Sequence, residues 1–215
     1  MTAQGIRKER RSARSMLGGR GTATHRFFDP QEDKWIIKVL PGQFYVTADP
    51  NEVIATVLGS CVAACIRDPE TGFGGLNHFM LPEDMGHAWG GADSSLRYGT
   101  FAMERLINEI VRTGCPRERL EIKLFGGSIL QSSQILIGSK NAEFVRRFLA
   151  QEQLPIAGED LGGRHARRIH FYPVTGRARR KFVMDAVETD LVTAEKTYRS
   201  MLVNEEQTGD IELFR

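Results

Sequence analysis

Short apolar segments alternate along the chain with turns rich in glycine, proline and aspartate, a pattern that is typical of β-strands. We predict two short strands between Trp35 and Val46, on either side of a turn at Pro41-Gly42. Further strands are predicted at 53–58, 62–66, 74–81, 120–125 and 156–159, together with a hairpin of 169–174 and 179–183 about Thr175-Gly176. Strands therefore make up most of the predicted fold.

Three segments carry apolar residues at helical spacing instead. The first follows a capping residue within 93–95 and ends within 114–116, and the second begins near Asn141. The third covers 189–203, with an apolar side made of Leu191, Ala194, Tyr198, Met201 and Leu202. Because the two clear helices lie between strands, we predict a layered α/β (α+β) domain.

Length and charge divide the 215-residue chain into one domain and two extensions. The predicted domain spans 35–185, between a leader at 1–34 and a helical extension and tail at 186–215. Residues 1–26 carry seven basic side chains against one acid, a net charge of +6, which leaves −4 for the rest of a chain whose total is +2. This basic arm lacks aromatic residues and periodicity, so we expect a disordered, solvated leader and no nucleic-acid partner.

Two absences in the sequence narrow the location of the protein. No apolar run approaches the roughly 20 residues that cross a bilayer, and the N-terminal segment lacks the apolar stretch of a secretory signal. We therefore expect a cytoplasmic monomer without membrane insertion. The sequence also lacks a Gly-x-x-x-x-Gly-Lys loop, so it gives no support for nucleotide binding.

The three cysteines, Cys61, Cys65 and Cys115, are an odd number and cannot form a complete set of disulfides. In a reducing compartment they are free thiols, metal ligands or a nucleophile. A zinc site of Cys61, Cys65 and His78 is disfavoured because strand residues four apart are separated by roughly 13 Å, although a helix over 61–66 would remove this objection. We expect no metal and no organic cofactor, and we interpret Cys65 and Cys115 as core thiols.

Cys61 and His78 lie on the two arms of a predicted hairpin whose turn contains Asp68 to Gly72. With the turn centred between residues 69 and 70, Cys61 lies opposite His78 or one position away. Directly opposed residues have Cβ atoms roughly 5 Å apart, which allows a sulfur–imidazole hydrogen bond. A register shift of one residue would instead place the two groups on opposite faces.

The segment around Cys61 suits a reactive thiol, because Gly59 breaks the chain between two predicted strands. Backbone N–H groups at such a turn can stabilise an oxyanion, and an imidazole can accept the thiol proton. The candidates to orient the imidazole are Thr56, Asn77 and Ser60. This hypothesis requires the sulfur to lie in an accessible pocket. The alternative is a core cysteine beside a structural histidine, and the residues alone leave both interpretations open.

A set of motifs at these positions resembles the CheD family of chemoreceptor glutamine deamidases. The resemblance covers roughly residues 43–214 and includes the 17-residue step from Cys61 to His78. Its motifs are Leu58-Gly59-Ser60-Cys61-Val62-Ala63-Ala64-Cys65, Arg67-Asp68-Pro69, Asn77-His78-Phe79-Met80-Leu81-Pro82, Arg97-Tyr98-Gly99, Lys123 with Phe125-Gly126-Gly127, Ile137-Gly138 with Asn141, Glu159-Asp160 with Gly162-Gly163, and Gly209-Asp210-Ile211-Glu212-Leu213-Phe214.

The resemblance implies a layered α/β fold related to the catalytic domain of cytotoxic necrotizing factor toxins, and a Cys, His, Thr triad. Cys61 and His78 match the first two members directly. Some relatives place the threonine six residues before the cysteine, where this chain has Ala55, whereas Thr56 lies five before. On a regular strand this difference reverses the face, so we expect a bulge or a shortened turn near Thr56.

The activity that the resemblance implies is hydrolysis of glutamine side chains to glutamate on methyl-accepting chemotaxis receptors, with release of ammonia. The partners it implies are the cytoplasmic helical region of these receptors and a CheC-type phosphatase. Glutamyl methyl ester hydrolysis would use the same thioester. Two alternatives remain open: a transglutaminase-like acyl transferase, and a non-catalytic adaptor that binds receptors or the phosphatase.

Overall fold

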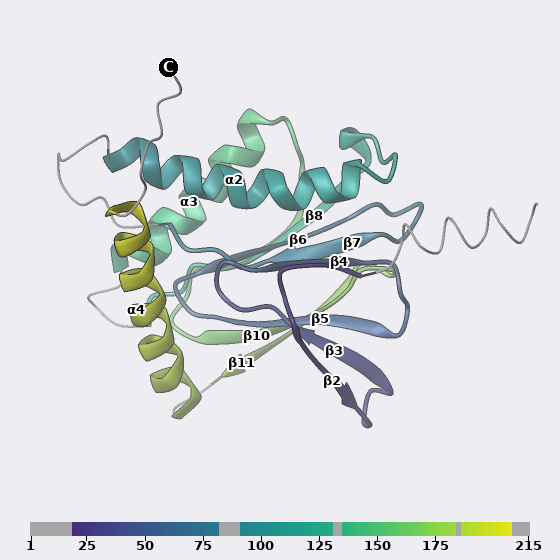
Figure 1. Cartoon of the computed structure of the whole chain (residues 1–215), viewed down its shortest axis with the longest axis horizontal. Helices are drawn as coiled ribbons and strands as arrows, with labels where there is room; N and C mark the ends of the chain where they lie inside the picture. The colour runs from purple at the N-terminus through teal and green to yellow at the C-terminus, as the bar shows by residue number, and fades with distance from the viewer. Residues whose placement is uncertain (1–18, 82–90, 131–134, 184–185, 208–215) are drawn as a thin grey trace, which may run out of the picture.

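Two β-sheets stacked face to face form the body of the molecule in a computed structural model, with helices over one of them (Figure 1). The structure describes residues 19–81, 91–130, 135–183 and 186–207. The predicted layered α/β class is confirmed by this arrangement. Within these ranges, no helix combines the length and apolarity needed to span a bilayer.

The first sheet has six strands in the order β1-β4-β7-β6-β8-β9. Its central strands β7, β6 and β8 pair antiparallel, and β9 joins β8 in parallel at one edge. The strands are β1 (Arg20–Gly21), β4 (Phe44–Thr47), β7 (Gly74–Asn77), β6 (Val62–Arg67), β8 (Glu121–Gly126) and β9 (Ile156–Leu161).

The second sheet has five strands in the order β11-β10-β5-β3-β2. Its central strand β5 pairs antiparallel with β10 and parallel with β3. The strands are β11 (Arg177–Val183), β10 (Ala166–Tyr172), β5 (Glu52–Leu58), β3 (Lys34–Lys38) and β2 (His25–Asp29). Because β5 and β6 are consecutive in the chain but belong to different sheets, residues 59–61 cross from one layer to the other.

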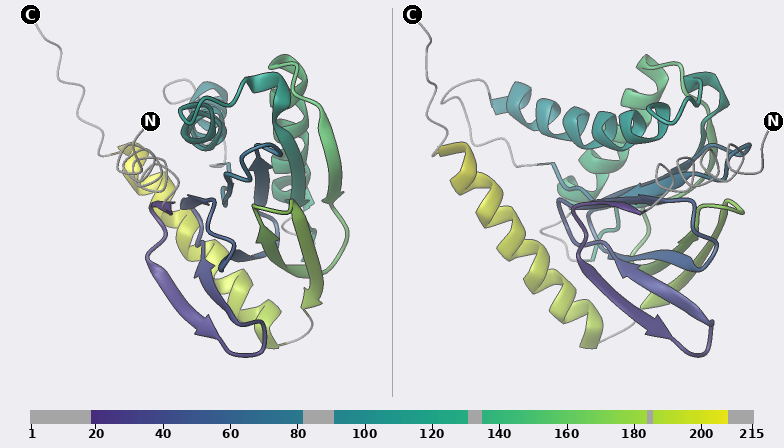
Figure 2. Two further views of the ribbon diagram at one scale, coloured as in Figure 1. Left: turned by 90° about the vertical axis from the view of Figure 1, so that its right-hand side faces the viewer. Right: turned by 45° about the vertical axis from the view of Figure 1, so that its right-hand side comes forward.

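Three α-helices and one short 3₁₀ helix complete the described fold. Helices α2 (Gly91–Val111) and α3 (Ile135–Gln151) cover the outer face of the six-stranded sheet, and a 3₁₀ helix at Arg117–Arg119 precedes β8. Helix α4 (Ala186–Gln207) runs along one side of the two sheets (Figure 2).

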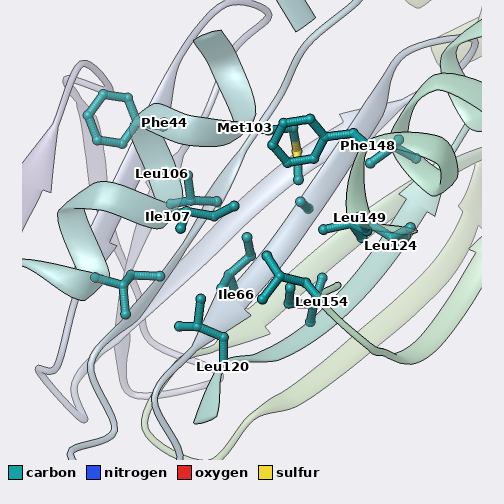
Figure 3. Close-up of a cluster of buried hydrophobic side chains, with 14 of the residues drawn as sticks. Phe44, Ile66, Met103, Leu106, Ile107, Leu120, Leu124, Phe148, Leu149 and Leu154 are labelled. Atoms are coloured by element: carbon teal, nitrogen blue, oxygen red, sulfur yellow. The ribbon is translucent and has the colours of Figure 1, made fainter. Parts of the chain in front are cut away.

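Two apolar layers follow from this stacking. The larger lies between the six-stranded sheet and helices α2 and α3, where residues such as Ile66, Met103 and Leu149 interdigitate (Figure 3). The second lies between the sheets and contains the alternate residues Cys61, Ala63 and Cys65 of the β6 region. Since side chains alternate along a strand, Cys61 faces the five-stranded sheet and not the helices.

Some predicted boundaries need correction. The leader predicted at 1–34 is too long, because residues 20–21 and 25–29 form β1 and β2, while residues 1–18 lie outside the described residues. The pattern failed there because Phe27 and Phe28 are exposed, so β2 follows its pairing with β3 rather than a buried face. Helix α3 begins six residues before the predicted Asn141.

Candidate active site

The loop between β5 and β6, residues Gly59 to Cys61, is held by its carbonyl groups. The N–H of Ser128 donates to the carbonyl oxygen of Gly59 at 2.7 Å, and the side-chain amide of Asn141 donates to that of Ser60 at 2.8 Å. The N–H of Gly127 donates to the carbonyl oxygen of Cys61 at 2.7 Å. With all three carbonyls bound to the scaffold, the loop is fixed in one conformation.

Glycine is required at position 126 for this attachment. Gly126 has φ of 112°, and a Cβ there would lie 2.1 Å from the carbonyl oxygen of Cys61. Only a residue without a side chain allows the backbone of β8 to approach the loop this closely. The Gly-Gly stop that ends the predicted strand 120–125 thus has a specific purpose: it lets residues 126–128 anchor the loop.

The amide groups of the same loop converge on one carboxylate, that of Glu195 in α4. The N–H groups of Gly59 and Cys61 donate to its Oε1 at 3.1 and 3.4 Å. The N–H of Ser60 donates to Oε2 at 3.3 Å, and the Ser60 hydroxyl donates to the same oxygen at 2.6 Å. The three consecutive amides therefore form a preorganised site for a negatively charged oxygen next to the Cys61 side chain.

The His78 ring is fixed by Thr56, which lies in the opposite sheet. The Thr56 hydroxyl lies 2.8 Å from His78 Nδ1 and 2.8 Å from the carbonyl oxygen of Val39. A carbonyl only accepts, so the single hydroxyl proton points to Val39, and the Thr56 oxygen accepts a hydrogen bond from Nδ1–H. His78 Nε2 therefore carries the lone pair, and this buried atom has no hydrogen-bond partner among the residues that the structure describes.

The register of the β6–β7 hairpin differs from the predicted one by two residues. Val62 pairs with Phe79 and Cys65 with Leu76, so Cys61 lies opposite Met80 and not opposite His78. The turn is two residues longer on its C-terminal side than predicted, because Arg67 pairs with Gly74 and the Asp68 N–H donates to the carbonyl oxygen of Phe73. A shift of two keeps both side chains on one face, and Cys61 and His78 become diagonal neighbours, whose Cβ atoms are roughly 7 Å apart in a regular sheet.

The bulge expected near Thr56 is absent, since β5 pairs with β10 in regular register from Ile54 to Leu58. Thr56 shares the inner face with Ile54 and Leu58, which belong to the apolar layer between the sheets. The bulge was expected because side chains were assumed to alternate regularly from Thr56 to Cys61. The loop at 59–61 instead crosses from one sheet to the other. Alternation does not continue through such a crossing.

The other two candidates to orient the imidazole have different partners. Asn77 points to the helical side, where its Oδ1 accepts from the Ala64 N–H and its Nδ2 donates to the carbonyl oxygen of Ala102. The Ser60 hydroxyl binds Glu195. Of the three candidates, the structure brings only Thr56 to the His78 ring.

Both reacting groups are neutral in this conformation. Burial lowers the pKa of the His78 imidazole from its ordinary 6.5 to about 3. Burial also raises the pKa of the Cys61 thiol well above its ordinary value, and the adjoining Glu195 carboxylate raises this pKa further. The two groups therefore rest as thiol and neutral imidazole, rather than as the charged pair that attacks a carbonyl.

The expectation of an accessible sulfur is wrong for this conformation, because Cys61 is 0% exposed. The physical reason is α4, whose Glu195 is itself only 1% exposed and lies over the loop. A cavity of about 220 Å³ beside this contact is lined by His78, Thr56, Leu191 and Glu195, among others. Space for a substrate group thus exists next to the site, between α4 and the sheets.

Two residues of the site were not predicted as such. Asn141 was noted only as part of a motif, yet its side chain joins the loop to the His78 strand, because its Oδ1 also accepts from the Leu81 N–H at 2.8 Å. Glu195 was missed. The available signal was its place in the series Leu191, Glu195, Tyr198, Leu202, where a charged residue interrupts a helical stripe of otherwise apolar side chains.

The remaining cysteines take no part in this arrangement. Cys65 is buried in the layer between the sheets and Cys115 in the larger apolar layer, and all three cysteines are free thiols. Among the described residues, no group of three or more His, Cys, Asp or Glu side chains is arranged to hold a metal ion.

The fold and the candidate site define a layered α/β protein in which a buried thiol lies beside three converging backbone amides, and an imidazole is held by a threonine hydroxyl. Residues 80–182 match the family model described as CheD chemotactic sensory transduction. The chain is 48% identical over 192 residues to the probable chemoreceptor glutamine deamidase CheD of Rhodopseudomonas palustris, covering 89% of this chain and 90% of the relative. It is 46% identical to the protein of the same name from Saccharophagus degradans, covering 90% and 91%. The chain belongs to the CheD family.

Among solved structures, the hypothetical protein YfiH of Bacillus licheniformis is similar with a TM-score of 0.34 and 17% identity, over 53% of this chain and 48% of that chain. A score of this size carries no argument about function. The expected relation to the catalytic domain of cytotoxic necrotizing factors stays a prediction.

Proposed function

We propose that this chain is a chemoreceptor glutamine deamidase that uses Cys61 as nucleophile, His78 as general base and acid, and Thr56 to orient His78. The observation that carries the proposal is the loop at 59–61, whose three amides bind a carboxylate beside the Cys61 thiol. The same amides stabilise the oxyanion that forms when a thiol attacks a carboxamide. The names of the CheD relatives support the same activity.

In the first half of the reaction, the carboxamide carbon of a target glutamine lies beside the Cys61 sulfur. His78 Nε2 takes the thiol proton as the sulfur attacks, and the carbonyl oxygen becomes an oxyanion held by the loop amides. Thr56 keeps the proton of the ring on Nδ1, so Nε2 is the nitrogen free to act. The imidazolium then gives its proton to the departing nitrogen, and ammonia leaves with formation of a thioester.

In the second half, water hydrolyses the thioester. His78 Nε2 takes a proton from the water, the resulting hydroxide attacks the acyl carbon, and the sulfur leaves and recovers its proton. The product is glutamate, so each turnover consumes one water, releases one ammonia and adds one negative charge to the target. A glutamyl methyl ester would pass through the same thioester, with methanol as the leaving group.

The targets that we propose are glutamines on the cytoplasmic helices of chemoreceptors, which places the protein in the cytoplasm. Every group used in the mechanism comes from one chain, so a monomer suffices. A CheC-type phosphatase is a further candidate partner.

The test is to incubate the purified chain with a chemoreceptor cytoplasmic fragment and to map glutamine-to-glutamate changes by mass spectrometry. Cys61→Ala and His78→Ala should show no conversion, whereas Cys115→Ala, a thiol outside the site, should retain it. A Glu195→Ala chain is assayed in parallel, because Glu195 occupies the loop amides. If neither the full chain nor Glu195→Ala converts any glutamine, the proposed function is wrong.

A labelled primary amine in the same assay separates hydrolysis from acyl transfer. Deamidation predicts glutamate and free ammonia, with the label absent from the receptor fragment. Incorporation of the amine at the converted glutamines would instead identify a transglutaminase-like activity. An adaptor without catalysis would give neither product and would still bind the receptor fragment when Cys61 is replaced by alanine.

A further inference from the structure

Glu195 occupies the part of the site that the mechanism reserves for the substrate. Its two carboxylate oxygens accept four hydrogen bonds from Gly59, Ser60 and Cys61, at 2.6 to 3.4 Å. Gly59 makes this approach possible, since a Cβ at that position would lie 2.7 Å from Glu195 Oε1. The contact joins residues more than 130 positions apart in the chain.

The chemistry of this contact is that of the product. A glutamate side chain has the length and planar end group of glutamine, and it is the side chain that deamidation leaves behind. Glu195 thus presents to the loop amides an oxygen in the place where the carbonyl oxygen of a target glutamine would become an oxyanion.

No cation of the described part of the chain neutralises the Glu195 carboxylate. Within the described residues, Glu195 forms no ion pair with a lysine, arginine or histidine, and it accepts hydrogen bonds from backbone amides and the Ser60 hydroxyl. A buried carboxylate is costly unless its surroundings are organised for negative charge. A site that tolerates Glu195 in this way is built to hold an anionic oxygen, which is the requirement for an oxyanion site.

The described side chains of α4 are mostly exposed or half-buried. Among its described side chains only Glu195 and Leu202 are buried, while Leu191, Tyr198 and Arg199 are half-buried. Tyr198 lies against Gly42, where a Cβ would be 2.5 Å from the tyrosine hydroxyl, and this hydroxyl contacts that of Tyr98. Such a helix can leave the sheets while most of the apolar layer between them stays packed, since Tyr198 is the described α4 side chain that packs against that layer.

We propose that α4 is a built-in pseudosubstrate helix, whose Glu195 side chain occupies the acyl site and closes Cys61 until a target helix displaces it. The inference rests on the proposed function, and it adds how the target glutamine reaches Cys61. The glutamine to be modified projects from one face of a helix, and that helix binds where α4 binds, with the side chain passing between the loop at 59–61 and His78.

The first test measures closure without any substrate. The full chain is treated with iodoacetamide, and alkylation of Cys61 is followed by peptide mass spectrometry. Glu195→Ala should increase the alkylation rate by at least about tenfold, because the charge-assisted hydrogen bonds that hold α4 over the sulfur are lost. Lys196→Ala is the matched control, since this exposed neighbour on the same helix should leave the rate unchanged. Equal rates for the full chain and Glu195→Ala overturn the inference.

The second test makes the pseudosubstrate a substrate. In Glu195→Gln, the glutamine side chain lies in the acyl site, and Cys61 should convert it to glutamate with release of one ammonia and consumption of one water. Mass spectrometry at residue 195 detects the change, and the double variant Cys61→Ala, Glu195→Gln should keep its glutamine. If Glu195→Ala deamidates the receptor fragment but residue 195 of Glu195→Gln stays glutamine, Glu195 does not occupy the acyl site.

Failure of the proposed function gives a different result. In that case Glu195→Ala still exposes Cys61 to iodoacetamide, yet no chain converts a receptor glutamine. Failure of the inference alone leaves Cys61 equally reactive in both chains, with receptor deamidation at equal rates. The two assays together therefore separate the closure of the site from its activity.

Discussion

Helices α3 and α4 both contact the loop that carries Cys61, but they are attached to the protein in different ways. Helix α3 contacts the carbonyl side of the loop through Asn141 and packs Phe144, Val145 and Leu149 into the larger apolar layer. Helix α4 contacts the amide side through Glu195, and of its described side chains only Glu195 and Leu202 are buried. Helix α3 is therefore part of the scaffold, whereas α4 lies over the candidate active site.

The two helices thus contact the loop in different roles: α3 helps to position it, and α4 occupies its amide groups. The carbonyl side of the loop must stay fixed throughout a reaction, and its partners Gly127, Ser128 and Asn141 all come from elements held by the core. In the proposed mechanism the amide side exchanges its partner, because a substrate oxygen needs the same N–H groups. A polar anchor on a lightly packed helix meets that need, since a substrate group can replace it with similar hydrogen bonds.

The largest expected effect contrasts the two anchors directly. Asn141→Ala leaves the Ser60 carbonyl and the Leu81 N–H buried without partners, so we expect a loss of roughly 2–5 kcal/mol in the free energy of unfolding. Glu195→Ala should lower it by only about 1.5 kcal/mol, because the desolvation of a buried carboxylate offsets part of the gain from its hydrogen bonds. Urea denaturation measures both values. Similar losses in the two variants would contradict the distinction between α3 as part of the scaffold and α4 as a helix that can be displaced.

The second effect concerns Thr56, which fixes the tautomer of His78. Thr56→Val removes the acceptor of Nδ1–H, and the misoriented ring should lower kcat by about 10- to 100-fold in the Glu195→Ala background. Thr56→Ser keeps the hydroxyl and should restore most of the rate. Steady-state kinetics should show the loss in kcat more than in KM. An unchanged kcat in Thr56→Val would remove Thr56 from the proposed triad.

The third effect is a pH dependence of stability that originates in His78. Its pKa is about 3 in the folded protein and near 6.5 when unfolded, so between these values the unfolded chain binds more protons. Stability is therefore unaffected above pH 6.5 and falls as the pH decreases below it, by up to about 1.4 kcal/mol per pH unit.

Urea denaturation at pH 5 and pH 7 measures this dependence. The wild-type chain should lose stability between the two values, and His78→Gln should lose clearly less. The carboxyls whose pKa values are lowered in the fold, Asp68, Glu121 and Glu159, contribute mainly at lower pH. An identical decrease in both chains would show that burial of His78 is not its source.

The smallest effect concerns a second contact of α4, at Tyr198, which lies farther along the helix than Glu195. Tyr198→Phe removes the hydroxyl contact with Tyr98 and keeps the ring against Gly42. We expect the alkylation rate of Cys61 to rise a few-fold, below the increase in Glu195→Ala, because one neutral hydrogen bond contributes about 1 kcal/mol. A rise as large as that of Glu195→Ala would shift the main anchor of α4 from the carboxylate to the tyrosine.

Local patterns were sufficient for most of the elements and for the main side chains of the candidate site. The apolar segments predicted β5, β6 and the β10–β11 hairpin, because burial of one or both faces leaves a short-range record in the sequence. Cys61 and His78 were placed on neighbouring strands by the Asp68–Gly72 turn. The exact register was not available, because it depends on the length of the turn, and a turn that is two residues longer moves the pairing by two positions.

By itself the sequence determined most of the strands, the hairpin that brings Cys61 near His78, and the family resemblance. Only the tertiary structure decided which sheet each strand joins, and with it that Thr56 reaches His78 across the gap between sheets without a bulge. It alone placed Asn141 and Glu195 on opposite sides of the Cys61 loop. The physical reason is that these contacts join residues 22 to 136 positions apart, and no local periodicity encodes which distant partner completes a hydrogen bond.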